Sequence, residues 1–294
     1  MQARLLLKYQ HDVKIILVAL LYYLTAHLGY FLSFEGTSAL PMWPPSGISF
    51  ALLILLGRSA WPGITIGSLL STILAYWYNR DLFPHELITI SLCIATGSTL
   101  ESLAGNYLVN HWIKDLYPFT ATKNAFRFLF VTLCMSIISA AVGTISLYFN
   151  GIIPGSNFIN TLFSWWQGNV VGVLVFTPFI LSCTRKITFT LSLVKKIELA
   201  VFVFNILLIS FLLQVDSLNN TMVHALPFLL LPVLLWLAFR FELLISITGV
   251  LIVSLISIFY TINNQGPFVL TDTSNSLLLL QIFIGVVSIS TVVL

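Results

Sequence analysis

The chain is built from long apolar runs in which charged residues are almost absent. Hydrophobic residues make up 58% of it and charged residues only 8%, and its mean hydropathy is +1.00. Soluble globular domains carry about 25% charged residues, so this chain lacks the polar surface that would keep it in water. Such runs predict membrane-spanning helices, which need about 20 apolar residues each. We therefore expect residues 1–294 to form a single integral membrane domain in contact with the lipid bilayer.

Ten apolar runs are long enough to form helices. They lie at residues 13–33, 45–57, 60–78, 86–109, 124–149, 158–182, 197–214, 223–238, 241–262 and 277–294. The runs at 45–57 and 223–238 are short for a bilayer, so they are expected to tilt inward or to re-enter the membrane. The predicted fold class is all-α, a polytopic integral membrane helical bundle of eight to ten transmembrane helices.

The basic residues predict the orientation of the bundle. If successive runs cross the membrane in alternation, twelve of the thirteen Lys and Arg residues fall on one side, and Arg80 alone falls on the other. Cytoplasmic loops carry the excess of Lys and Arg, so the N- and C-termini are both predicted to be cytoplasmic. The twelve are Arg4, Lys8, Lys14, Arg58, Lys114, Lys123, Arg127, Arg185, Lys186, Lys195, Lys196 and Arg240.

Several function classes are disfavoured by the sequence. Cys93, Cys134 and Cys183 lie far apart in separate apolar runs, which predicts neither a disulfide framework nor a metal site. The net charge of +3 is spread over short loops, which argues against a nucleic-acid partner. No glycine-rich nucleotide loop and no catalytic triad pattern occurs. We expect no enzyme activity, cofactor or metal in this region.

A Trp-Pro-Pro corner opens the second run. Proline in the first turn of a helix has a preset φ and sacrifices no hydrogen bond, so this corner predicts a helix start. The exposed amides of that first turn are expected to offer a modest site for an anion or a carbonyl group. The corner reads Pro41-Met42-Trp43-Pro44-Pro45-Ser46-Gly47.

Together with five further motifs, the corner resembles the signature of the MASE1 family. The other pieces are Thr99-Leu100-Glu101-Ser102, Trp165-Trp166-Gln167-Gly168-Asn169 with Gly172 and Pro178, Phe239-Arg240-Phe241, Gly266-Pro267-Phe268 and Leu280-Gln281. MASE1 domains are membrane-associated sensor domains at the N-terminus of bacterial histidine kinases and cyclic-dinucleotide enzymes. The resemblance covers nearly the whole chain. Two positions depart from the family pattern, which often has an acid at Asn169 and a glycine at Glu242.

The resemblance implies a multi-pass signal-transduction protein of the bacterial inner membrane. It also implies a cytoplasmic output domain in cis, such as a two-component histidine kinase, and leaves a homodimer open as the assembly. The last run ends at Leu294 without an aromatic or basic anchor, whereas natural spans usually carry one. We therefore expect this chain to be the N-terminal part of a longer protein.

Glu101 is the strongest single candidate for a functional residue. It lies near the middle of the 86–109 run, where an acid costs about 2.5–3.5 kcal/mol on insertion scales and normally faces a partner or a cavity. Its two interpretations are a sensing or ion-coupling group and a hydrogen-bonded acid that ties two helices together.

The polar residues of the 158–182 run are expected to face the same interior cavity as Glu101. Trp166, Gln167 and Asn169 need internal partners in hydrocarbon, and we expect Gln167 and Asn169 to converge with Glu101. Gly168 and Gly172 also fit a close helix–helix contact in which polar side chains form hydrogen bonds between the helices.

Four residues complete the predicted ligand-binding set. Trp43, Pro45 and Ser46 are expected to form the rigid outer wall of the site, and Gln281 enters the bilayer just after the turn at 266–268. A structural reading, in which Trp43 is an interfacial anchor and Pro45 a helix start, remains open.

Three functions fit the sequence. The first is a signal-input domain that binds an unknown small ligand and controls a cytoplasmic output module. The second is a small-molecule or ion transporter or channel, since an intramembrane acid beside broken helices also suits translocation. The third is a passive anchor and oligomerisation domain. No inverted repeat is visible to favour transport.

The predicted orientation can be tested by cysteine labelling after the three native cysteines are replaced by serine. A membrane-impermeant thiol reagent added to intact cells should label Thr37→Cys and Asn219→Cys, because both fall in outer loops of the predicted topology. It should not label Lys123→Cys or Lys195→Cys. Labelling of Lys123→Cys from outside would overturn the topology.

Overall fold

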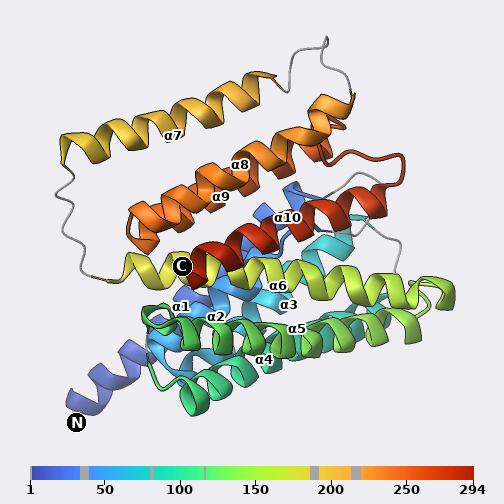
Figure 1. The fold of residues 1–294 in the computed structure, drawn as a ribbon. Coiled ribbons are helices and arrows are strands. Elements are labelled where there is room, and N and C mark those ends of the chain that lie inside the picture. Colours follow the sequence, from blue (N-terminus) through green and yellow to red (C-terminus); the bar gives the residue numbers. More distant parts are fainter. Residues whose placement is uncertain (1, 34–39, 80–82, 116, 186–191, 213–219) are drawn as a thin grey trace.

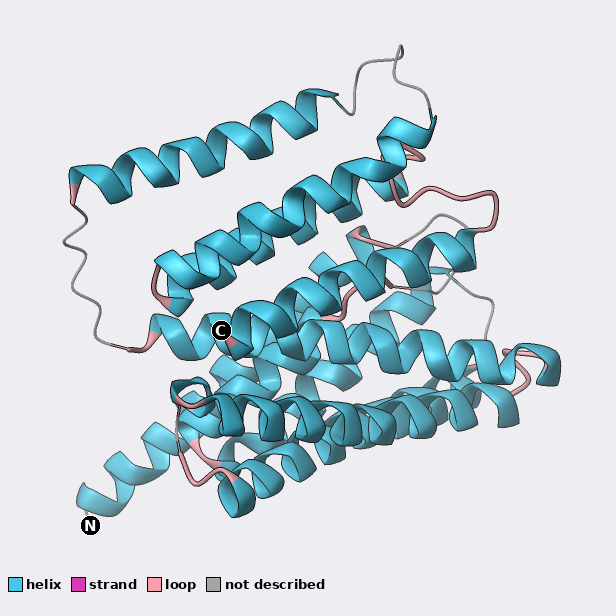
Figure 2. Ribbon diagram, viewed as in Figure 1, coloured by secondary structure: helices cyan, strands magenta, loops and turns pink. Residues whose placement is uncertain are grey.

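The computed structural model describes residues 2–33, 40–79, 83–115, 117–185, 192–212 and 220–294. Within these ranges the chain is helical and shows no strand (Figures 1 and 2). The ten α-helices are α1 (Gln2–Phe31), α2 (Pro44–Leu56), α3 (Trp61–Asn79), α4 (Pro84–Trp112), α5 (Thr122–Phe149), α6 (Phe158–Cys183), α7 (Leu193–Leu212), α8 (Asn220–Arg240), α9 (Leu243–Ile262) and α10 (Thr273–Val293). The all-α polytopic bundle predicted from the sequence is confirmed.

Each predicted run corresponds to one helix, and the largest differences in length are in α1, α4 and α8. α1 starts at Gln2 rather than at residue 13, and α8 has 21 residues although Pro227 and Pro232 lie inside it. The described parts of α1, α4, α5, α6, α9 and α10 are long and apolar enough to span a membrane. The short α2, with 13 residues, is as predicted.

Both ends of the chain lie at the same end of the bundle, at the left of Figure 1. Contacts at that end join the start of one helix to the end of another. Lys14 Nζ donates to the Leu56 carbonyl at 3.5 Å, and Arg127 donates to the Trp112 carbonyl at 2.7 Å. The alternation of helices is therefore as predicted. Which end is cytoplasmic remains a prediction, and its test positions Thr37 and Asn219 lie outside the described residues.

α2 occupies the middle of the bundle and packs against α6, α1 and α4. Every residue from Pro44 to Leu53 is buried, as expected for a helix that is apolar on all sides. Thirteen residues give about 20 Å of helix, less than the roughly 30 Å of hydrocarbon. The first turn of α2 can therefore lie at membrane depth rather than at the surface.

Two glycines of α6 make room for the backbone of the corner at residues 40–47. The Trp43 amide donates to the Gly168 carbonyl at 2.9 Å. A Cβ atom on Gly172 would overlap the Trp43 carbonyl, and one on Gly47 would overlap the Gly172 carbonyl. The predicted close contact of small residues is thus confirmed, and its partner is the first turn of α2.

α7 forms the outermost layer, beyond α8 and α9 (Figure 1). It is linked near one end by the ion pair between Glu198 and Arg240, at 2.8 Å, and near the other by Tyr260, whose hydroxyl donates to the Ser210 carbonyl at 3.0 Å. Between these links the buried Phe202 joins the core of α8 and α9. α7 is therefore held by polar links near both ends and by apolar packing between them.

The backbone contact between α2 and α6 predicts a strong effect of a single methyl group. Gly172→Ala should lower thermal stability in detergent, because overpacking typically costs about 1–3 kcal/mol and the obstructing atom is a carbonyl that cannot rotate away. Gly285→Ala on α10 is the matched control, since a Cβ there meets no atom within 4 Å. Equal melting temperatures for the two variants would contradict the contact.

Candidate functional site

The carboxyl of Glu101 lies at the centre of a buried polar cluster. Glu101 is near the middle of α4 and only 1% exposed. Its Oε2 accepts hydrogen bonds from Ser46 Oγ on α2, at 3.3 Å, and from Asn169 Nδ2 on α6, at 3.4 Å. Ser46 is placed there by the first turn of α2, and Asn169 by the turn of α6 that carries Gly168 and Gly172. Three segments far apart in sequence thus meet at one acid.

Serine hydroxyls line the remaining sides of this cluster. Ser136 and Ser139 of α5 lie beside the same carboxyl, and both are buried. Ser49 lies one turn farther along α2 than Ser46, and Ser102 follows Glu101 on α4. Their hydroxyls are hydrogen-bonded to each other at 3.0 Å. Four helices therefore supply oxygen and amide groups to one small region.

The polar layer continues into α1 and α3. Tyr22 Oη donates to Ser98 Oγ at 3.2 Å, and Ser68 Oγ donates to the same oxygen at 3.4 Å. Ser98 lies one helical turn before Glu101 on α4. The layer therefore crosses the first half of the bundle at one depth.

Three buried polar atoms of the cluster have no hydrogen-bond partner in the described part of the chain. They are Oε1 of Glu101, Oδ1 of Asn169 and Oγ of Ser136. Buried polar atoms are normally satisfied by protein or by ordered water, and an unsatisfied one typically costs about 1–3 kcal/mol. The described residues therefore leave the hydrogen bonding of this cluster incomplete.

The structure unites some of the predicted site residues and separates others. Glu101, Ser46 and Asn169 meet, as expected. Gln167 does not join them. Among the described residues it makes no hydrogen bond to Glu101 or Asn169, and at 100° per residue it lies about 200° around α6 from Asn169. Trp166 also points elsewhere, since its Nε1 donates to the Leu133 carbonyl on α5 at 3.0 Å. The expected convergence of Gln167 is wrong.

Gln281 and Trp43 contact the corner rather than the acid. Gln281 of α10 is 2% exposed, and its Nε2 donates to the Leu40 carbonyl at 3.1 Å. The Trp43 ring packs on Tyr30 of α1, with 5.5 Å between ring centroids, and a Cβ on Gly29 would touch it. These contacts support the structural interpretation of Trp43.

The corner is not an open rim with free amides, which corrects the expected anion site. Pro44 and Pro45 fill the first two positions of α2 and have no N–H. The next amide, that of Ser46, donates to the Trp43 carbonyl at 3.3 Å. The donors that normally make a helix N-terminus attractive to anions are thus absent or used.

Sequence reasoning missed the contribution of α5. Thr132, Ser136 and Ser139 are buried polar residues spaced four and three apart, so they share one helical face. That spacing within an apolar run is the signal that could have revealed a polar face on the 124–149 run.

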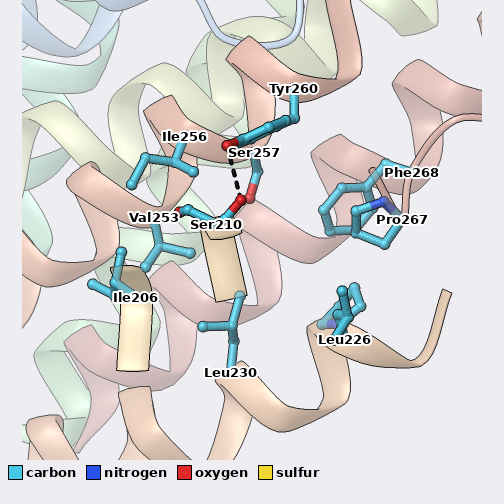
Figure 3. Close-up of a pocket in the computed structure, with 11 residues that line it drawn as sticks. Ile206, Ser210, Leu226, Leu230, Val253, Ile256, Ser257, Tyr260, Pro267 and Phe268 are labelled. Carbon is cyan, nitrogen blue, oxygen red and sulfur yellow. Dashed lines mark hydrogen bonds between the residues drawn. The ribbon is translucent and has the colours of Figure 1, made fainter. Parts of the chain in front are cut away.

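A pocket lies between α7, α8 and α9, near the turn that leads to α10 (Figure 3). It is small, about 30 Å³, which is room for one or two water molecules. Apart from the Ser210, Ser257 and Tyr260 hydroxyls, its lining is apolar: Ile206, Leu226, Pro227, Leu230, Val253, Ile256, Pro267 and Phe268. It has no charged group and lies in the other half of the bundle from Glu101.

A family model matches residues 13–294, which include every element of the polar cluster and of the corner. The chain belongs to the MASE1 family. MASE1 domains are membrane-associated sensor domains, so this chain is a multi-pass helical sensor domain. The searches of curated proteins and of solved structures found no match.

In this MASE1 domain no group of three or more His, Cys, Asp and Glu residues in the described ranges is arranged to hold a metal ion. The donors gathered around Glu101 are hydroxyl, amide and carboxyl groups. Such a set fits hydrogen-bonding ligands.

The packing of Trp43 predicts that its main effect is on stability. Trp43→Ala should lower the melting temperature in detergent, by less than the about 3–5 kcal/mol typical of a fully buried Trp→Ala change, because Trp43 is only partly buried. Trp43→Phe should recover part of the loss. Trp77→Ala on α3 is the control, since Trp77 is 68% exposed. Unchanged stability of Trp43→Ala would show that the ring packs less tightly than described.

Proposed function

We propose that this MASE1 domain is a signal-input unit of the bacterial inner membrane. Its polar cluster around Glu101, Ser46 and Asn169 receives a small ligand or a membrane-associated signal. The change then passes through the bundle to a cytoplasmic output domain in cis, such as a histidine kinase or a cyclic-dinucleotide enzyme. Family membership supports the sensor role, because MASE1 domains are linked to cytoplasmic output domains.

The observation that carries this proposal is a continuous chain of contacts from Glu101 to α10. Ser46, which bonds Glu101, belongs to the first turn of α2. The backbone just before that turn is held by Gly168 of α6, and the Leu40 carbonyl is held by Gln281 of α10. Moving α2 therefore acts on the last helix.

The position of the C-terminal end of α10 suits the transmission of a change to a cytoplasmic output domain. α10 finishes at the same end of the bundle as the N-terminus (Figure 1), the end predicted to be cytoplasmic. It packs on α9, α6, α8 and α5, so a shift of α10 would change several contacts at once. A ligand can bias such a shift only if it binds the two arrangements unequally.

The hydrogen bond between Gln281 and Leu40 provides the test. In the full-length protein, Gln281→Leu should leave the Leu40 carbonyl unpaired and change the basal output activity by about fivefold or more, the lower end of typical allosteric coupling. Membrane abundance should stay close to that of the wild type, because one lost neutral hydrogen bond contributes about 0.5–1.5 kcal/mol. Output is read as autophosphorylation or cyclic-dinucleotide synthesis in membranes.

Ile282→Ala is the matched control on the same helix. Ile282 is 51% exposed and faces away from the bundle, so its truncation should leave output unchanged. Gln281→Leu with normal abundance and normal basal output would count against transmission through α10, and would favour a passive anchor.

A further inference from the structure

Glu101 lies in an interior without a balancing positive charge. It forms no salt bridge with any Lys, Arg or His among the described residues. The ion pair found in those residues joins Glu198 to Arg240. The elements packed around its carboxyl contribute Ser46 from α2, Ser136 and Ser139 from α5 and Asn169 from α6. The titratable group that faces it is Tyr22 of α1. An ionised carboxylate here would thus be an isolated negative charge.

The hydrogen bonds to Glu101 are too few and too long for a stable carboxylate. Hydrogen bonds that support an ionised group are usually about 2.5–2.9 Å long, whereas those from Ser46 and Asn169 measure 3.3 Å and 3.4 Å. Both reach Oε2, and Oε1 has no hydrogen-bond partner among the described residues. An isolated buried charge normally neutralises instead.

A proton on Oε1 would extend the hydrogen bonding of the cluster. It would turn Oε1 from an acceptor without a donor into a donor. The other two unpaired atoms, Asn169 Oδ1 and Ser136 Oγ, are both acceptors within the same cluster. A hydrogen on Oε1 would be available to one of these two acceptors, and the Ser136 hydroxyl can rotate to suit.

We propose that Glu101 is a reversible proton-binding site, and that the arrangement described is its protonated state. Loss of the proton would leave a carboxylate that needs short, strong donors. The hydroxyls beside the carboxyl are those of Ser46 on α2 and of Ser136 and Ser139 on α5, so deprotonation draws α2 and α5 toward α4. This inference rests on the proposed sensor function. In that function the proton is the signal that α2 passes to α10, or it binds together with the signal.

Infrared difference spectroscopy on the purified chain in lipid vesicles tests the site without reference to output. Shifting the pH from neutral to alkaline should remove the carbonyl stretch of one protonated carboxyl per chain. That band should be missing in Glu101→Gln and present in Glu198→Gln, whose carboxylate is already ionised in its pair with Arg240. Glu101→Asp, which keeps a carboxyl, should restore a band at a shifted frequency.

Two results would overturn the proton site. One is the absence of any protonated-carboxyl band that depends on Glu101. The other is a band that disappears on adding Na⁺ at constant pH and not on raising the pH at constant Na⁺, which would make the cluster a cation site. Choline chloride at equal ionic strength is the control for salt.

Output measurements separate this inference from the proposed function. In the full-length protein, output should change by about fivefold or more across the pH range in which the band disappears. Glu101→Gln, which keeps the shape and cannot ionise, should hold output at the low-pH level throughout. A pH-dependent band with pH-independent output would keep the proton site and reject the sensor function.

Discussion

The fold of this MASE1 domain depends on a contact between two stretches of backbone. Residues 43–47 lie against Gly168 and Gly172 so closely that a single Cβ atom would overlap a carbonyl group. The Trp43 amide and the Thr177 hydroxyl add hydrogen bonds across this contact, at 2.9 Å and 2.8 Å. In lipid, where apolar burial gives helices little reason to associate, close packing and such hydrogen bonds hold them together.

This contact explains how an acid comes to be buried at membrane depth. Because α2 is short and its first turn is fixed to α6, Ser46 and Asn169 both face the middle of α4. The carboxyl of Glu101 then has polar neighbours on several sides, which lowers the cost of placing it in hydrocarbon. The same arrangement leaves three polar atoms of the cluster without a hydrogen-bond partner among the described residues, and the proposed proton site is built on these atoms.

The two halves of the bundle are suited to different tasks. The half formed by α1 to α6 contains the polar cluster and the close backbone contact. The half formed by α7 to α9 has a mostly apolar core with a few buried hydroxyls, such as those of Ser246, Ser254 and Thr261, and Glu198 and Tyr260 link α7 to it. α10 packs on elements of both halves, and its Gln281 reaches the corner. The hydrogen bonds of Trp43 with Gly168 and of Gln281 with Leu40 thus join the half that contains the cluster to α10.

The sequence by itself determined the class of fold, the ten helices, the alternation of their directions and the presence of an acid, Glu101, within an apolar helix. Hydropathy and charge act locally along the chain, so they can be read without knowing which helices touch. It also singled out Ser46 and Asn169, because polar groups in apolar runs need partners. What those partners are was decided only by the tertiary structure. Gln167 and Asn169 are two residues apart and yet face different sides of α6, the serines of α5 complete the cluster, and two prolines remove the free amides expected at the corner. Such facts depend on the rotation of each helix about its axis, which packing against Gly168 and Gly172 decides.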